Sequence, residues 1–240
     1  MPVTPQPQGL STSLNRSLSD QVAAYLRQAI QDGRIAPGQR LIEEQIARAV
    51  QMSRGPVRDA LRILENERLV IRYANRGAFA AALTLRDAEE IFSLRQALEG
   101  VAIEYAIKSA SAEQIAALDA IVQRMAELCE QDYTPMQATE IDLDFHYALC
   151  EISGHSRVLA AWSAQRVQVG LLIMTHRTAH PDDFRNRAVD YHGQLVDAIL
   201  RRDARLASGL LHVHMAASLQ GVEDAIKQQA EITAHRSTTA

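Results

Sequence analysis

The segment from Ser53 to Arg62, Ser-Arg-Gly-Pro-Val-Arg-Asp-Ala-Leu-Arg, constrains the fold most strongly because it predicts a helix with two different faces. Ser53 is a suitable N-cap, and Pro56 falls in the first turn, where a missing N–H costs least. At about 100° per residue, arginines and apolar residues separate onto neighbouring faces. Arg54, Arg58 and Arg62 share one face, and Val57, Leu61 and Leu64 share the other. One face can pack against a core while the other reaches outward.

Two further helices and a hairpin are predicted around this segment. Apolar residues at helical spacing indicate helices at Leu18–Asp32 and Glu43–Val50, and two short apolar runs around a turn indicate a hairpin at Leu69–Ala80. Only two residues separate the second helix from the Ser53 cap, which is the spacing of a helix-turn-helix. Arg76 stands at the predicted tip of the hairpin, as on the wing of a winged-helix domain.

Residues 18–80 resemble the winged-helix domain of the GntR family of bacterial transcription regulators. The motifs that carry the resemblance are Pro37-Gly38, Leu41-Ile42-Glu43, Ser53–Leu61, Leu64-Glu65 and Gly77. The resemblance implies that the chain binds a double-stranded DNA operator. One departure is Arg68, which stands where the family most often has the glycine of Glu-Gly-Leu-Val and therefore places a side chain in that turn.

The arginine face suggests how DNA would be read. Arginine can bind guanine O6 and N7 with two bonds in the major groove, so we expect Arg54 and Arg58 to contact bases and Arg62 and Arg76 to meet mainly phosphate. The expected DNA-binding set is Ser53, Arg54, Arg58, Arg62, Arg76 and Gly77. Because one winged helix touches few phosphates, a homodimer that reads an inverted repeat is expected.

Charge is divided unequally along the chain. Residues 1–82 contain 11 Arg, no Lys and seven acidic residues, which leaves 14 of the 25 basic and 22 of the 29 acidic residues to the remainder. Phosphate affinity depends on the local patch, so only the first part is suited to a polyanion. A chain of 240 residues also has room for a second domain of about 150 residues.

The remainder of the chain predicts helices almost throughout. They lie near 84–109, 111–132, 135–152, 156–178, 182–201 and 203–229. The fold class is therefore mainly α, with an N-terminal winged helix-turn-helix and a small β-hairpin wing followed by an antiparallel bundle of about six helices. The expected divisions are a flexible arm at 1–17, the winged-helix domain at 18–82, the all-α domain at 83–229 and a flexible tail at 230–240.

Cysteine usage and hydropathy indicate the compartment. Cys129 and Cys150 form no CxxC pair, and no secretory signal precedes them, so a reducing cytoplasmic setting is expected. No unbroken apolar run approaches the roughly 20 residues that span a bilayer, so no membrane contact is expected.

Four potential metal ligands point into the predicted bundle. Asp142 and His146 lie one turn apart beside an apolar stripe, and His192 and His214 fall within the stripes of two later helices. His212, about 160° from His214, is expected to face water. One aspartate and three histidines suit a divalent cation such as Zn²⁺ or Ni²⁺. Buried histidines are more often hydrogen-bonded core residues, and periodicity alone leaves the two interpretations evenly balanced.

Residues 84–222 resemble the FCD effector domain of the FadR-like subgroup of GntR regulators. The matching motifs are Asp142-x3-His146, Tyr191-His192 and Asp203–His214. The resemblance implies that Asp142, His146, His192 and His214 bind the metal and that the effector is a small organic acid. The chain would then regulate, in our interpretation repress, an operon for organic acid catabolism.

An open metal position can either hold a carboxylate or polarise water. Inward arginines favour the first use because they need an anion, so Arg95 and Arg166 are expected beside a small carboxylate effector. His176 also falls on an inward face and is expected near the same effector. An internal Arg95–Glu99 ion pair is an equal alternative, and Glu99 is the one carboxylate that we can place as a base for hydrolysis. A metal-dependent hydrolase fused to a DNA-binding domain and a purely structural metal bundle therefore remain as alternatives.

Overall fold

The computed structural model describes residues 17–31, 33–74 and 76–238, and for 232–238 the backbone only. The chain divides into two compact units between Leu83 and Thr84. The flexible arm expected at 1–17 lies outside the described residues except for Ser17. The Ser17 hydroxyl accepts a bond from the Asp20 amide, and the Asp20 carboxylate accepts one from the Ser17 amide, at the start of the first helix.

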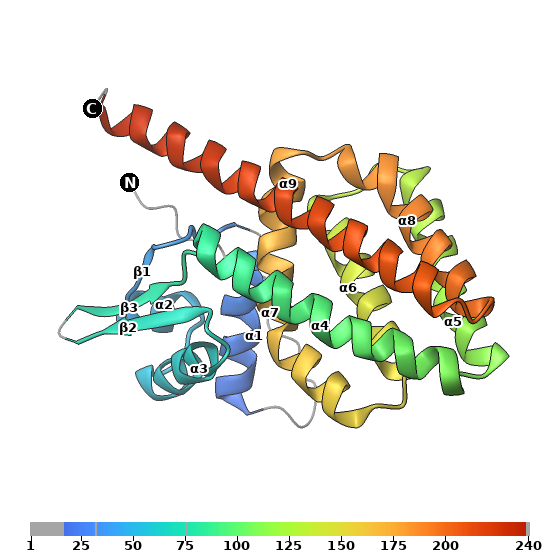
Figure 1. Cartoon of the computed structure of the whole chain (residues 1–240). Coiled ribbons are helices and arrows are strands. Elements are labelled where there is room, and N and C mark those ends of the chain that lie inside the picture. Colours follow the sequence, from blue (N-terminus) through green and yellow to red (C-terminus); the bar gives the residue numbers. More distant parts are fainter. Residues whose placement is uncertain (1–16, 32, 75, 239–240) are drawn as a thin grey trace. The chain divides into compact units, whose positions relative to one another are not determined.

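Three helices and a small antiparallel sheet make up the described part of the first unit (Figure 1). The elements are α1 (Leu18–Gln31), β1 (Arg40–Leu41), α2 (Glu43–Ala49), α3 (Arg54–Asn66), β2 (Val70–Tyr73) and β3 (Gly77–Ala80). The strand order is β1-β3-β2. Helices α1 and α2 pack on α3, and Val57, Leu61 and Leu64 are each 0% exposed. The predicted winged helix-turn-helix is confirmed, whereas β1 is too short for an alternating pattern to predict it.

Arg68 lies in the turn between α3 and β2 with a left-handed backbone, at φ +57°. The Arg68 amide donates to the Glu65 carbonyl at 3.0 Å, and the Leu69 amide donates to the Leu64 carbonyl at 2.9 Å, so the end of α3 is closed by two bonds. Glycine reaches this conformation without interference from a Cβ atom. The turn therefore keeps the glycine conformation with an arginine in it, at a backbone cost of about 1 kcal/mol.

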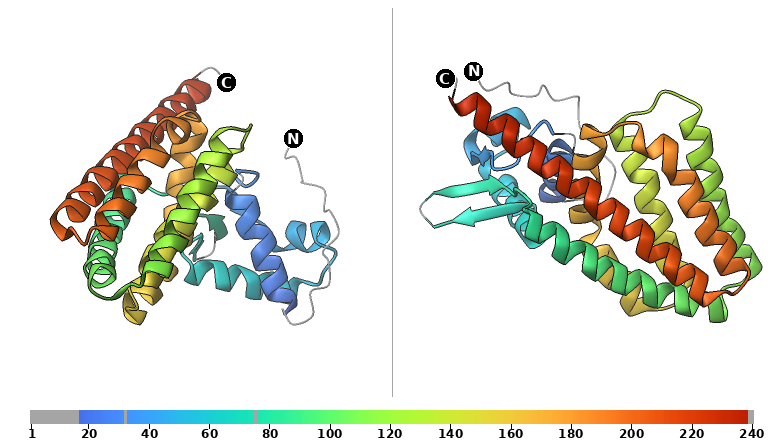
Figure 2. Two further views of the ribbon diagram at one scale, coloured as in Figure 1. Left: turned by 90° about the vertical axis from the view of Figure 1, so that its right-hand side faces the viewer. Right: turned by 45° about the horizontal axis from the view of Figure 1, so that its top comes forward.

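Six helices form the described part of the second unit. They are α4 (Leu85–Ser109), α5 (Ala112–Cys129), α6 (Pro135–Ile152), α7 (Ser156–Ala179), α8 (Asp183–Leu200) and α9 (Ala204–Thr238). Helix α4 packs on α9, α6 on α7, and α5 on α8; Figure 2 shows α4 and α9 running side by side. Phe92, Phe145 and Trp162 are among the largest fully buried side chains. The mainly α fold class with a helical bundle is confirmed.

Reciprocal capping boxes fix the starts of three of these helices. Thr84, Ser111 and Thr134 each accept a bond from the amide three residues further on, and the side-chain oxygen at that position accepts a bond from the cap amide. Each box satisfies two amides that the helix itself leaves without partners. Pro135 suits the first turn of α6 because that position needs no donor. These local signals explain why the predicted starts of α4, α5 and α6 agree with the structure to within one residue.

The last helix is longer than its sequence predicts. Helix α9 continues to Thr238, although the polar composition from residue 230 favours a flexible tail. The helical stretch from 230 to 238 contains no proline or glycine that would end a helix. No helix in the described ranges is both long and apolar enough to cross a membrane.

Candidate functional site

The polar face of α3 carries three exposed arginines. The side chains of Arg54, Arg58 and Arg62 are 61%, 55% and 67% exposed. Arg54 Nη2 lies 3.1 Å from Glu44 Oε2, and Arg58 Nε lies 3.5 Å from Glu43 Oε2, so two of the three pair with carboxylates of α2. Exposed ion pairs contribute about 0–1 kcal/mol. A phosphate or a base edge can therefore replace either carboxylate at little cost.

The start of α3 and the tip of the hairpin hold the other predicted DNA contacts. Ser53 has the extended backbone of an N-cap, but within the described part of the chain its hydroxyl makes no capping bond. The predicted cap is thus right in position and wrong in its hydrogen bond, which leaves the first-turn amides able to bind an anion. Arg76 is exposed in the turn before β3. Gly77 has φ +94°, which an L side chain rarely adopts.

Four side chains from α6, α8 and α9 converge inside the second unit. His146 Nε2 lies 3.2 Å from His192 Nε2 and 3.2 Å from His214 Nε2, and Asp142 Oδ1 lies 3.6 Å from His192 Nε2. One ligand atom from each residue lies within 4.8 Å of all the others. Bonds of about 2.0–2.1 Å to a tetrahedral Zn²⁺ place ligand nitrogens about 3.3 Å apart. The structure brings the four predicted ligands together as a group that could hold one metal ion, and the two distances from His146 Nε2 to the other imidazole nitrogens are close to this spacing.

Two of these imidazoles are held from behind by oxygen acceptors. His146 Nδ1 lies 2.7 Å from Glu99 Oε2, and His192 Nδ1 lies 2.6 Å from the Ala188 carbonyl oxygen. An Nδ1–H that donates to such an oxygen leaves the lone pair on Nε2. Both rings therefore present Nε2 to the common point. The sequence does not predict this supporting layer, because a backbone carbonyl has no residue-specific signal.

Glu99 is the centre of a buried polar network. Its side chain is 0% exposed, and Oε1 accepts bonds from Arg95 Nε at 2.8 Å and from Trp162 Nε1 at 2.9 Å, while Oε2 faces His146. Burial opposes its ionisation, but the charges of His146 and Arg95 outweigh burial and lower the pKa of Glu99 to about 2. The sequence places Glu99 at the margin of its stripe as a candidate base. In the structure Glu99 is fully buried and both of its carboxylate oxygens have partners. The alternative Arg95–Glu99 ion pair is present.

Burial also sets the protonation of the ligand cluster. It lowers the pKa of His192 to about 4 and that of His214 well below its ordinary value. At Asp142, burial opposes ionisation, but the Arg177 guanidinium outweighs it and the carboxyl pKa falls below its ordinary value. His192 and His214 are therefore neutral and Asp142 is ionised near neutral pH, which are the forms of these groups that bind a metal.

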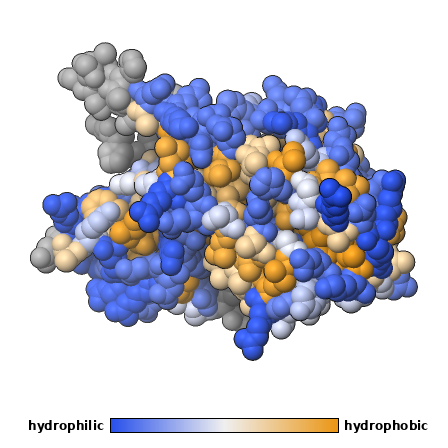
Figure 3. Space-filling model, in the orientation of Figure 1, coloured by the Kyte–Doolittle hydropathy of each residue, from blue (hydrophilic) through white to orange (hydrophobic). Residues whose placement is uncertain are grey.

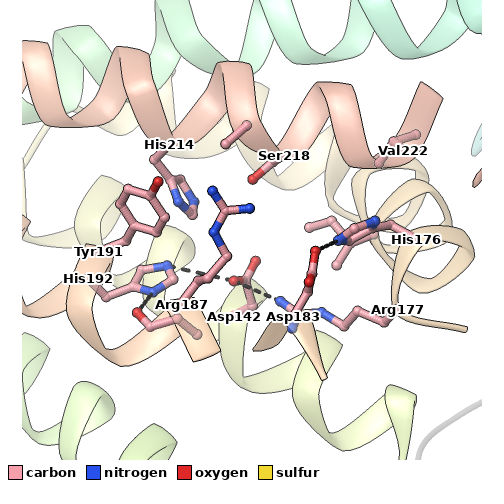
Figure 4. Close-up of a pocket in the computed structure, with 13 residues that line it drawn as sticks. Asp142, His176, Arg177, Asp183, Arg187, Tyr191, His192, His214, Ser218 and Val222 are labelled. Atoms are coloured by element: carbon pink, nitrogen blue, oxygen red, sulfur yellow. Dashed lines mark hydrogen bonds and ion pairs between the residues drawn. The ribbon is translucent and has the colours of Figure 1, made fainter. Parts of the chain in front are cut away.

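A cavity of about 70 Å³ opens beside the ligand cluster (Figure 4). Asp142, His192 and His214 line it, whereas His146 is 0% exposed. The other polar side chains in its wall are His176, Arg177, Asp183, Arg187, Tyr191 and Ser218. A cation held by the cluster would thus be reached from this cavity.

Of the three predicted effector residues, only His176 lines the cavity, and its Nε2 lies 3.2 Å from Asp183 Oδ2. Arg95 is 0% exposed and is not part of the cavity wall. Arg166 is not part of the wall either, since its Nη2 lies 2.9 Å from Asp144 Oδ1. Helical periodicity gives the face on which a residue starts, but a long guanidinium stem can end elsewhere. The expected position of Arg166 beside the effector cavity is corrected accordingly.

Two arginines of the cavity are absent from the sequence-based set. Arg177 is 8% exposed, donates from Nη2 to Asp142 Oδ1 at 3.0 Å and lies 4.4 Å from the centre of the Phe184 ring. Arg187 is exposed, and its guanidinium lies 5.8 Å from the centre of the Tyr191 ring. Arg187 and Tyr191 are one helical turn apart. The sequence could therefore have indicated Arg187, because it lies one turn before Tyr191, the residue next to the predicted ligand His192.

Two family models match the chain. The model described as bacterial regulatory proteins, gntR family, matches residues 18–80, and the model described as FCD domain matches residues 90–217. A solved GntR-type regulator from Rhodococcus sp. RHA1 has 24% identity and a TM-score of 0.71, and the match covers 86% of this chain and 98% of that one. At that identity the likeness concerns the fold.

Curated relatives agree with these matches. The HTH-type transcriptional regulator BphR of Paraburkholderia xenovorans is 30% identical over 86% of this chain and 86% of its own length. The gluconate operon transcriptional repressor of Bacillus subtilis is 28% identical over 85% of this chain and 84% of its own length. The match with the regulator YdhC of Bacillus subtilis, at 30% identity, spans 56% of this chain and 59% of that relative. The chain therefore belongs to the GntR family of bacterial regulatory proteins and carries an FCD domain behind its winged helix.

Proposed function

We propose that this transcription regulator is a repressor whose DNA affinity is set by a small carboxylate effector bound at a divalent metal ion. The convergence of Asp142, His146, His192 and His214 beside a cavity carries the proposal. One relative is the gluconate operon transcriptional repressor of Bacillus subtilis, which supports the control of an organic acid operon. We place its action in the cytoplasm, where bacterial operator DNA lies.

The donor set suits Zn²⁺ or Ni²⁺, because both accept imidazole nitrogen and carboxylate oxygen. A bound ion would supply a Lewis-acid position that an effector carboxylate can occupy. The protein's own contribution is orientation: Glu99 and the Ala188 carbonyl fix two rings, and Arg177 holds Asp142. Since the ligands come from α6, α8 and α9, an ion there would tie three helices to one point.

The proposed DNA contacts follow from the exposed face of the first unit. Arg54 and Arg58 would contact bases in the major groove, because their present partners are exposed carboxylates. The remaining proposed contacts, mainly to phosphate, come from Ser53, Arg62, Arg76 and Gly77. Two such units related by two-fold symmetry would read an inverted repeat.

A second copy of the chain is the proposed occupant of an apolar face on α4 and α9. Its residues, each 36% to 52% exposed, are Leu94, Val101, Tyr105, Leu206 and Val213. Steps of seven residues keep such side chains on one side of a helix, and Figure 3 shows hydrophobic residues gathered where these helices run in Figure 1. A two-fold interface pairs one patch with itself, as a palindromic operator requires.

Light scattering tests this interface. The double variant Val101→Asp/Val213→Asp should be monomeric at micromolar concentration, because four new charges would face each other in the dimer. Leu200→Asp is the matched control, since Leu200 is 56% exposed and lies at the end of α8. A dimer that survives the double substitution would move the interface elsewhere.

A metal-dependent hydrolase fused to a DNA-binding domain is the alternative from another class. The Asp183–His176 pair in the cavity favours it, because a carboxylate can orient an imidazole that moves a proton. Incubation of the Zn²⁺-loaded protein with small carboxylate esters and amides separates the two functions. A regulator leaves these compounds intact, whereas a hydrolase converts them.

The proposed function as a whole is tested by DNA binding with and without metal. Full-length protein loaded with Zn²⁺ is titrated onto DNA from upstream of its own gene, with small organic acids added and with the metal removed by chelator. We expect an effective acid to change DNA affinity by about 5- to 150-fold, the range of ordinary coupling, and only while the metal is bound. An identical change in DNA affinity after metal removal would show that the effector does not bind at the metal ligands.

A further inference from the structure

Arg187 has an aromatic ring as its neighbour, whereas Asp142, Arg177 and Asp183 in the same cavity each take part in an ion pair. Asp142 pairs with Arg177, and Asp183 pairs with His176. Arg187 lines the same cavity but takes part in none of the ion pairs or hydrogen bonds found in the described part of the chain. The guanidinium carbon of Arg187 lies 5.8 Å from the centre of the Tyr191 ring. Asp142 and Asp183 thus each have another partner in the wall, a guanidinium and an imidazole, and the guanidinium of Arg187 is left for a ligand.

The position of Arg187 relative to the ligand cluster sets the size of that ligand. Arg187 precedes the ligand His192 by five residues on α8, which separates their Cα atoms by about 7.5 Å along the helix axis. In Figure 4 the Arg187 side chain extends across the cavity toward the α9 side, where His214 and Ser218 lie. The cavity of about 70 Å³ is several times larger than the ~10–15 Å³ that a single water needs. This space suits a compound of a few carbon atoms with a polar group at each end.

We propose that Arg187 is the second anchor of the effector and that the site therefore selects small dicarboxylates over monocarboxylates. This inference rests on the proposed function, because the first carboxylate occupies the metal position. The second carboxylate meets the Arg187 guanidinium, whose two parallel N–H groups match its two oxygens. The Tyr191 and Ser218 hydroxyls, which also line the cavity, are placed to donate to the same group.

Calorimetric titration of the full-length protein loaded with Zn²⁺ tests this anchor. The probes are the diacids from malonate to adipate and the monoacids of equal chain length. We expect at least one diacid to bind tenfold or more tightly than its matched monoacid. Arg187→Gln should lower that diacid's affinity about ten- to a hundredfold, the range for a lost hydrogen bond to a charged group, and leave the monoacid's affinity and the zinc content unchanged.

Arg185→Gln is the matched control for this experiment. Arg185 is an exposed arginine of the same helix, and its Nη2 donates to the Gln131 carbonyl at 3.0 Å away from the cavity wall. Its replacement should leave every affinity unchanged. Equal binding of diacids and monoacids by the unmodified protein, or a diacid preference that survives Arg187→Gln, would overturn the second anchor and leave the metal-bound carboxylate standing. Failure of every acid to bind would overturn both.

Discussion

The arginines of α3 and those of the bundle carry the same charge but have partners of different kinds. Arg54 and Arg58 are more than half exposed and pair with carboxylates of α2 that water also reaches. Arg95 and Arg177 are 0% and 8% exposed and pair with buried carboxylates. An exposed pair is worth little and can be exchanged for DNA, whereas breaking a buried pair leaves an uncompensated charge. Arginines with exposed partners are therefore suited to bind DNA, and arginines with buried partners stabilise the fold.

The largest effect that this comparison predicts follows from removing Glu99. Glu99→Ala should lower the free energy of unfolding by about 3–5 kcal/mol, because Arg95 loses its buried counter-charge and His146 its acceptor. Glu44→Ala, which removes the exposed partner of Arg54, should change it by less than about 1 kcal/mol. Urea unfolding of both variants measures the difference. Equal losses in the two would erase the distinction between buried and exposed pairs.

Acid should destabilise the metal-free protein through its buried histidines. The unfolded chain takes up protons at histidine below its ordinary pKa of about 6.5, whereas burial lowers the pKa of folded His192 to about 4. Stability is thus fully present above pH 6.5 and falls as the pH drops toward 4, by on the order of 3 kcal/mol for this residue. His192→Gln should flatten the profile in that window, and His212→Ala should leave it unchanged. Thermal melts between pH 4 and 8 report the slope.

The exposed arginines should act on DNA and leave stability alone. Arg58→Ala should weaken operator binding by about 1–3 kcal/mol and relax the preference at one base pair, because a base contact is lost. Arg76→Ala should weaken all sequences alike and lower the salt slope by about one unit. Binding titrations on operator and random DNA at several salt concentrations distinguish these two effects. Normal operator binding by Arg54→Ala and Arg58→Ala would show that α3 does not read bases.

The smallest predicted effect concerns the turn after α3. Arg68→Gly should stabilise the first unit by about 0.5–1 kcal/mol, because glycine adopts a φ of +57° without strain. Arg68→Ala is the control, since it removes the charge and keeps the Cβ atom. A higher midpoint of chemical unfolding for the glycine variant alone supports the backbone explanation. Equal stabilisation by alanine would assign the effect to the arginine side chain.

Much of the fold could be predicted because its signals are local. Capping residues such as Thr84 and Ser111, together with apolar stripes, mark where helices begin and which face is buried. Where such signals fail, the reason is equally local: β1 has two residues, and the extension of α9 past 229 has a polar composition without a helix breaker.

The candidate site could be predicted only in part, because its residues differ in how far they reach. Short side chains such as Asp142 and His146 end close to the face on which they start, so periodicity brings the ligands together. Arginines extend further, and Arg166 of α7 ends beside Asp144 of α6, a partner that depends on tertiary packing. The backbone carbonyl of Ala188, which accepts a bond from His192, cannot be predicted from a pattern of side chains.

Elemental analysis of the full-length protein, purified without chelator, tests the central claim most directly. The account predicts about one divalent ion per chain in the unmodified protein and in His212→Ala, whose replaced side chain is exposed on the same helix as a ligand. It predicts no bound ion, and lower thermal stability, in His192→Ala/His214→Ala, because two of four ligands are gone. An unmodified protein without metal, or full metal content in the double variant, would contradict the site.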